Sequence, residues 1–113
     1  MISNIQLPEN ILRDLEHLLA VIISDASVRS VILFGSTVHG NMTPHSDIDL
    51  LVLVDSEGAD INHIASRIRQ ETFGKVSFPL DLIVETRQDY LERSLLPTLE
   101  RRISREGKVL YAA

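Results

Sequence analysis

Hydrophobic residues recur at helical spacing near the start of the chain and form shorter runs further along. Over 8–24 they return every three or four positions, which is the spacing of one buried face of an α-helix. Largely apolar runs of strand length fall in 29–34, 47–54 and 78–84. The run over 47–54 is apolar on both faces, so it predicts a central strand or one covered by helices on both sides.

Capping residues mark two helices in the second half of the chain. Asp60 predicts the start of a helix over 61–72. Gly74 predicts the end of that helix, because glycine readily adopts the conformation found just after a helix C-terminus. Thr86, with an acidic residue three positions later, resembles a capping box and predicts another helix from residue 87.

The end of the chain predicts a last helix and a short strand. Pro97 separates the last helix, which runs to about residue 105, from the one before it. The segment 108–111 has the length of a short edge strand, and a short helix over 36–40 with a loop over 41–46 completes the pattern. We therefore predict an α/β fold, a small mixed β-sheet packed with helices, in a single domain over 1–113.

Composition and charge narrow the classes of function. The 113 residues suit one small core, and hydrophobic and charged shares of 44% and 24% are typical of a soluble globular protein. No apolar run approaches the ~20 residues that cross a bilayer, and no signal-peptide pattern is visible. The net charge of −5 argues against direct, non-specific binding of nucleic acid. Because cysteine is absent, the fold uses no disulfide, and we expect a cytoplasmic protein.

Two polar motifs lie between the first two predicted strands. Gly35-Ser36 directly follows the first strand, and Asp47-Ile48-Asp49 opens the second. Side chains alternate along a strand, so Asp47 and Asp49 point to the same face, where their carboxylates repel each other. A divalent cation removes this repulsion, and Mg²⁺ favours a few carboxylates together with water and phosphate oxygens. Gly35 lets a phosphate approach the backbone, and Ser36 opens a short helix whose free N–H groups attract anions.

A third carboxylate interrupts the apolar run of the third predicted strand. Asp81 stands between leucines, and an aspartate in such a place is unusual unless it has a partner. Two metal ions held by three carboxylates can promote an in-line displacement at phosphorus. The structural alternatives are a turn or capping role for Asp47 and Asp49 and an ordinary salt bridge for Asp81.

These residues resemble the nucleotidyltransferase superfamily of DNA polymerase beta, in particular its short prokaryotic branch, the minimal nucleotidyltransferases. The pattern of that family is Gly-Ser, ten residues, Asp-x-Asp and a separate Asp on a later strand. The chain carries it as Gly35-Ser36, Asp47-x-Asp49 and Asp81. The complete three-part pattern is specific, whereas Asp-x-Asp alone would be weak. The resemblance implies the polymerase beta-like nucleotidyltransferase fold.

Two further segments bear on this resemblance. The segment 105–111 is similar to the usual ending of these small proteins, so the resemblance spans nearly the whole chain. Many members have x-Ala-Arg-Gly after the Gly-Ser pair, whereas this chain has His39 before Gly40. Histidine is only partly charged near neutral pH and lacks the planar fork of arginine. This departure lowers the triphosphate affinity or the rate that we expect, and it leaves the metal site unaffected.

The resemblance implies a Mg²⁺-dependent transfer of a nucleoside monophosphate. It implies that Asp47, Asp49 and Asp81 hold two Mg²⁺ ions and that Gly35 and Ser36 bind the phosphates of a nucleoside triphosphate, namely ATP. AMP would pass to a hydroxyl group, which Asp81 helps to deprotonate, and pyrophosphate would leave. Minimal nucleotidyltransferases often act beside a HEPN-type RNase toxin, as antitoxins that add AMP to a tyrosine of the toxin. The resemblance therefore implies a HEPN-type partner.

Two other functions are compatible with the sequence. The first is a non-catalytic antitoxin or binding module that masks a partner protein, which His39 favours slightly and which the three aspartates disfavour. The second is a free-standing transferase acting on a small molecule such as an aminoglycoside, without any protein partner. Replacing both Asp47 and Asp49 by asparagine distinguishes catalysis from masking, because masking does not depend on the carboxylates.

Overall fold

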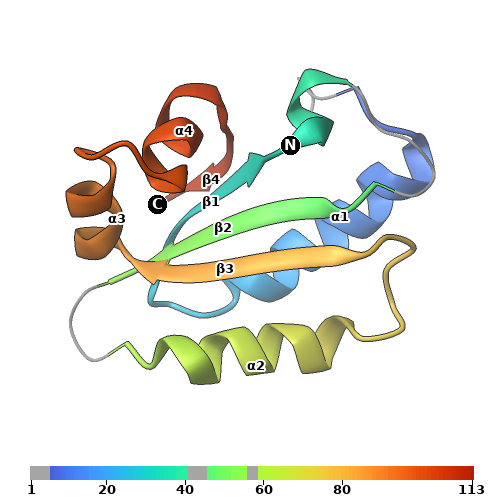
Figure 1. Cartoon of the computed structure of the whole chain (residues 1–113). Helices are drawn as coiled ribbons and strands as arrows, with labels where there is room; N and C mark the ends of the chain where they lie inside the picture. The colour runs from blue at the N-terminus through green and yellow to red at the C-terminus, as the bar shows by residue number, and fades with distance from the viewer. Residues whose placement is uncertain (1–5, 41–45, 56–58) are drawn as a thin grey trace.

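The computed structural model of the chain describes residues 6–40, 46–55 and 59–113. Nine elements follow one another within these residues (Figure 1). They are α1 (Glu9–Ile23), β1 (Val28–Phe34), the 3₁₀ helix η1 (Ser36–His39), β2 (Ile48–Val54), α2 (Ile61–Thr72), β3 (Leu80–Thr86), α3 (Arg87–Arg93), α4 (Leu99–Glu106) and β4 (Lys108–Ala112).

The four strands form one mixed sheet in the order β3-β2-β1-β4. Strand β2 pairs in parallel with β3, while β1 pairs antiparallel with both β2 and β4. The parallel pair is connected through α2, which is the usual crossover for parallel neighbours. The predicted small mixed sheet with helices is therefore confirmed, and β4 is the predicted edge strand.

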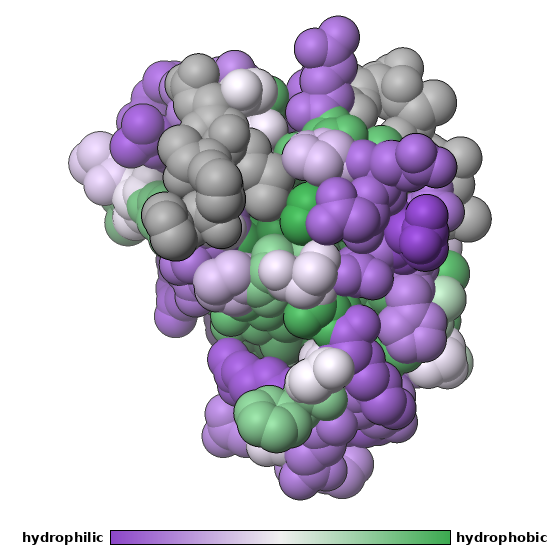
Figure 2. Space-filling view, turned by 90° about the vertical axis from the view of Figure 1, so that its right-hand side faces the viewer, coloured by the Kyte–Doolittle hydropathy of each residue, from purple (hydrophilic) through white to green (hydrophobic). Residues whose placement is uncertain are grey.

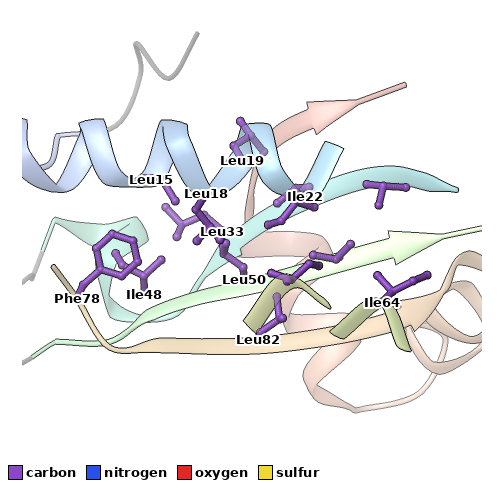
Figure 3. Close-up of a cluster of buried hydrophobic side chains, with 14 of the residues drawn as sticks. Leu15, Leu18, Leu19, Ile22, Leu33, Ile48, Leu50, Ile64, Phe78 and Leu82 are labelled. Atoms are coloured by element: carbon purple, nitrogen blue, oxygen red, sulfur yellow. The ribbon is translucent and has the colours of Figure 1, made fainter. Parts of the chain in front are cut away.

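Helices cover both faces of the sheet (Figure 1). One buried cluster joins α1 and α2 to alternate positions of the strands, among them Leu50 and Leu82 (Figure 3). A second buried cluster on the opposite face joins Leu51 and Leu53 of β2 to Tyr90 of α3 and Ile103 of α4. Because β2 contributes successive residues to opposite clusters, its continuous apolar run follows from burial on both sides, as predicted.

The third strand differs from its prediction. It was expected over 78–84, but β3 begins at Leu80 and continues to Thr86. Pro79 has no N–H group for a strand ladder, and its carbonyl instead accepts a hydrogen bond of 2.8 Å from the Ile48 amide. At the other end, the polar residues Glu85 and Thr86 fall outside the predicted apolar run, yet both pair with β2.

The capping predictions are confirmed. The Asp60 side chain accepts a hydrogen bond from the amide two residues into α2, and Thr86 accepts one from the Asp89 amide at the start of α3. Gly74, just beyond α2, has a φ of +73°. The predicted loop over 41–46 lies outside the described residues apart from Ser46. Among the described helices, none is both long and apolar enough to cross a membrane.

Candidate active site

The predicted site residues gather at the end of the sheet where β1 stops and where β2 and β3 begin, on the right of Figure 1. Asp49 of β2 lies opposite Asp81 in the parallel β2–β3 register. On its other side Asp49 lies opposite Phe34, the last residue of β1. Gly35 and Ser36 follow Phe34 directly, so the pairing brings both predicted motifs to one edge of the sheet.

Gly35 is in close contact with Asp49. A Cβ atom at Gly35 would lie 2.1 Å from Asp49 Oδ2, a distance that no side chain can occupy. The backbone of Gly35 has a φ of +82° and a ψ of −161°, a conformation that is essentially restricted to glycine. Glycine is therefore required here for two reasons, its backbone conformation and the space that the carboxylate fills.

The helix η1 carries the next part of the site. It begins at Ser36, whose side chain is exposed, and ends at His39, before Gly40, which has a φ of +74°. Thr37 is 1% exposed and anchors the short helix in the protein interior. This arrangement leaves Ser36 and His39 at the surface beside Asp49.

A pocket of about 370 Å³ lies beside Gly35, Ser36, His39 and Asp49, which are among its lining residues. One side of it comes from the Gly35–His39 segment and from Asp49, and the other side comes from α4. The lining residues from α4 are Leu99, Arg102, Ile103 and Glu106. Figure 2 faces this end of the molecule and shows hydrophobic surface in its centre between polar groups. Sequence reasoning missed the wall from α4, because only the packing of Ile103 under β1 and β2 brings that helix to the site.

The carboxyl group of Asp49 is in an unfavourable environment for a negative charge. Burial, the charge of Asp81, a hydrogen bond with Asp81 and the charge of Asp47 together raise the pKa of Asp49 to about 6, and burial is the largest of these causes. Asp47 precedes β2, and both Asp47 and Asp81 are exposed. A cation between these carboxylates would offset their repulsion, which is the electrostatic property expected of a metal site.

The residues fit a magnesium site in their donor chemistry. Asp49 and Asp81 supply carboxylate oxygens from neighbouring strands, and Mg²⁺ completes its coordination with water and substrate phosphate oxygens rather than with a full protein cage. Within the described part of the chain, no three acidic or histidine side chains converge into a ready-made metal site. The structure thus pairs Asp49 with Asp81 and places Gly35 and Ser36 in the adjoining pocket, whereas Asp47 and Asp81 do not line that pocket.

Comparison with known proteins identifies chains that are similar in sequence and in fold. A relative from Methanocaldococcus jannaschii, a candidate protein adenylyltransferase, is 29% identical over 84 residues, which cover 74% of this chain and 79% of the relative. A chain in the crystal structure of a variant of the toxin–antitoxin MntA-HpeT superposes with a TM-score of 0.59 at 28% identity, covering 96% of this chain and 75% of that one.

A second solved structure, a toxin–antitoxin with AMP-PNP, has the same fold. Its TM-score is 0.55 at 20% identity, and the alignment covers 94% of this chain and 75% of that chain. The family model described as "Polymerase beta, Nucleotidyltransferase" matches residues 16–113. Since this match takes in most of the chain, including both motifs and the pocket, the chain belongs to the polymerase beta nucleotidyltransferase family and is a nucleotidyltransferase.

Proposed function

We propose that the chain transfers AMP from ATP to a hydroxyl group of a partner protein, and that this partner is a HEPN-type toxin modified on a tyrosine. The observation that carries the proposal is the position of Asp49, held between the Gly35 backbone and Asp81 at the edge of a pocket. The M. jannaschii relative, a candidate protein adenylyltransferase, supports a protein acceptor. The toxin–antitoxin complexes among the similar structures support an antitoxin role.

In this mechanism Asp47, Asp49 and Asp81 would hold Mg²⁺, and Gly35 and Ser36 would bind the β- and γ-phosphates. Bound Mg²⁺ would supply charge neutralisation on the phosphate oxygens and at the attacking oxygen. Asp81 accepts the proton of the acceptor hydroxyl, whose oxygen forms a bond to the α-phosphorus. The bond from that phosphorus to the α–β bridging oxygen breaks, and pyrophosphate leaves with the bonding electrons. Gly35 lets the substrate approach the backbone closely, because glycine has no side chain. A side chain at this position would also displace Asp49.

Exposed leucines on and between α3 and α4 support a protein acceptor. Leu91, Leu95, Leu96 and Leu99 are 55%, 79%, 61% and 47% exposed. Neighbouring exposed hydrophobic residues of this kind are typical of protein-binding surfaces. Leu99 also lines the pocket, so a protein bound over these leucines would lie beside the bound nucleotide.

The same leucines favour one alternative, a module that neutralises a toxin by masking it. Masking needs the exposed leucines and does not need the carboxylates. Catalysis needs both, so substitutions of the aspartates distinguish the two functions.

The experiment is a label transfer with ATP labelled at the α-phosphate, Mg²⁺ and lysate of the source organism. The wild type and the Asp47→Asn/Asp49→Asn variant are compared. We expect a labelled protein band with the wild type only, and mass spectrometry of that band to place AMP on a tyrosine. Absence of any labelled protein, together with binding of a partner by both proteins, would support masking and contradict the proposal.

A further inference from the structure

One arginine of α4 lies in the pocket of Gly35, Ser36 and Asp49. Arg102 lines that pocket although it is distant in sequence from both motifs. Its side chain is 75% exposed, so a ligand in the pocket can contact it directly. In Figure 1 α4 and η1 lie on the same side of the sheet, and Ser36 of η1 and Arg102 of α4 both line the pocket.

Binding of a polyphosphate in this pocket requires a positive charge that offsets the acidic lining residues. Asp49 and Glu106 are the acidic residues among its lining residues, and their carboxylates repel a polyphosphate. Among the described residues that line the pocket, His39 is the only other one that can carry a positive charge, and a histidine, unlike an arginine, is not always charged. Arg102 is therefore the one permanent positive charge that the described part of the chain contributes to the pocket lining.

The guanidinium group of Arg102 is held in a way that leaves donors for a ligand. Its Nε donates to Glu106 Oε2 at 3.1 Å, one helical turn further along α4. Among the described residues, its two terminal nitrogens have no hydrogen-bond partner. Glu106 thus restricts the side chain while the terminal N–H groups stay available, and paired N–H groups of arginine match the geometry of phosphate oxygens.

We propose that Arg102 binds the terminal phosphates of the nucleoside triphosphate and that Glu106 positions it. This inference rests on the proposed ATP-dependent function, and it assigns to α4 a part of phosphate binding that His39 cannot supply alone. Arginine-to-phosphate contacts reach the phosphates absent from AMP. Loss of Arg102 therefore weakens the binding of ATP far more than that of AMP.

The test is calorimetric titration of MgATP and of AMP into the full chain and its variants. Arg102→Gln should weaken ATP binding by about ten- to one-hundred-fold and change AMP binding by less than about two-fold. Arg102→Lys should lie between, because lysine keeps the charge and loses the fork. Arg105→Gln is the matched control, since Arg105 lines a neighbouring pocket but not this one.

Four outcomes overturn the inference. Unchanged ATP affinity in Arg102→Gln would remove Arg102 from phosphate binding while the proposed function stands, provided that the wild type binds MgATP. An equal loss of ATP affinity in Arg105→Gln would show a general charge effect, and an equal loss of AMP affinity in Arg102→Gln would show a structural one. Failure of the wild type to bind MgATP would overturn the proposed function and the inference together.

Discussion

At the residue scale, the site depends on how closely Asp49 approaches Gly35. The carboxylate occupies the space that any side chain at Gly35 would need, so the two residues restrict each other. Asp49 also lies beside Asp81, and burial and like charge oppose its ionised form. The fold therefore keeps a carboxylate where it costs stability, which is typical of residues retained for a ligand rather than for packing.

Gly35→Ala should abolish activity, whereas Gly40→Ala should not. Both glycines have a positive φ, of +82° and +74°, so both substitutions should lower the free energy of unfolding by about 1–2 kcal/mol. Only at Gly35 would the new Cβ collide with Asp49, since no described atom lies within 4 Å of a Cβ at Gly40. Urea unfolding and AMP-transfer rates measure the two effects, and equal loss of activity in both variants would contradict the geometric explanation.

Asp49→Asn should remove the stabilisation by Mg²⁺. We expect the wild-type Tm to rise by about 4 °C or more on adding millimolar Mg²⁺ and to fall back with EDTA. The variant should show no such rise, because the repelling carboxylate pair that attracts the cation is gone. Asp60→Asn is the control, since asparagine also caps a helix and Asp60 lies at the start of α2. A Mg²⁺-dependent Tm in Asp49→Asn would exclude Asp49 as a ligand.

At the element scale, the sequence predicts the motifs better than their assembly. Gly35-Ser36 and Asp49 could be placed at strand ends, because apolar runs mark the strands. The Asp49–Asp81 pair depends on parallel pairing of β2 and β3, which involves residues far apart in the sequence. The wall formed by α4 was not predicted, because its exposed polar residues read as a solvated helix and only Ile103 is buried.

A second acidic pair links β3 to α4 and makes stability depend on pH. Glu85 is 8% exposed, and Arg93 of α3 lies 3.5 Å from Glu85 and 3.4 Å from Glu100. Burial, with the hydrogen bond and charge of Glu100, raises the pKa of Glu85 to about 7. The hydrogen bond from Glu85 lowers the pKa of Glu100, so the pair shares one proton across the two elements.

The free energy of unfolding should fall as the pH rises from about 4.5 to about 7. In this window the folded state binds more protons than the unfolded state, because the folded pKa of Glu85 lies above its ordinary value of 4.5. We expect Glu85 to cause a loss of about 1–2 kcal/mol across the window, and Glu85→Gln, which keeps a donor toward Glu100, to retain only the smaller loss due to the raised pKa of Asp49. Chemical unfolding at several pH values measures the free energy of unfolding. Glu16→Gln is the control, because Glu16 is exposed. A pH profile of Glu85→Gln identical to that of the wild type would contradict the role of Glu85.

At the scale of the whole molecule, the candidate active-site pocket and the proposed partner-binding surface are adjacent. The pocket opens at the end of the sheet, and α4 forms its wall while carrying Leu99 toward the exposed leucines of the α3–α4 segment. The chain carries a net charge of −5, yet Arg101, Arg102 and Arg105 gather along α4. A partner with an apolar and acidic surface would complement this helix, and its modified hydroxyl would then face the pocket.

The double variant Leu95→Ser/Leu96→Ser should separate partner modification from nucleotide binding. Both leucines are largely exposed, so their loss should change the free energy of unfolding by less than about 0.5 kcal/mol and should leave MgATP affinity unchanged. Transfer of labelled AMP to the protein acceptor should fall by about ten-fold or more, because burying a leucine side chain contributes about 1.5–3 kcal/mol and serine loses that contribution. Phe73→Ser is the matched control, since Phe73 is 88% exposed but follows α2, on the opposite side of the sheet from α3 and α4. If Phe73→Ser abolished the transfer and the leucine variant did not, the acceptor would have to bind at the end of α2.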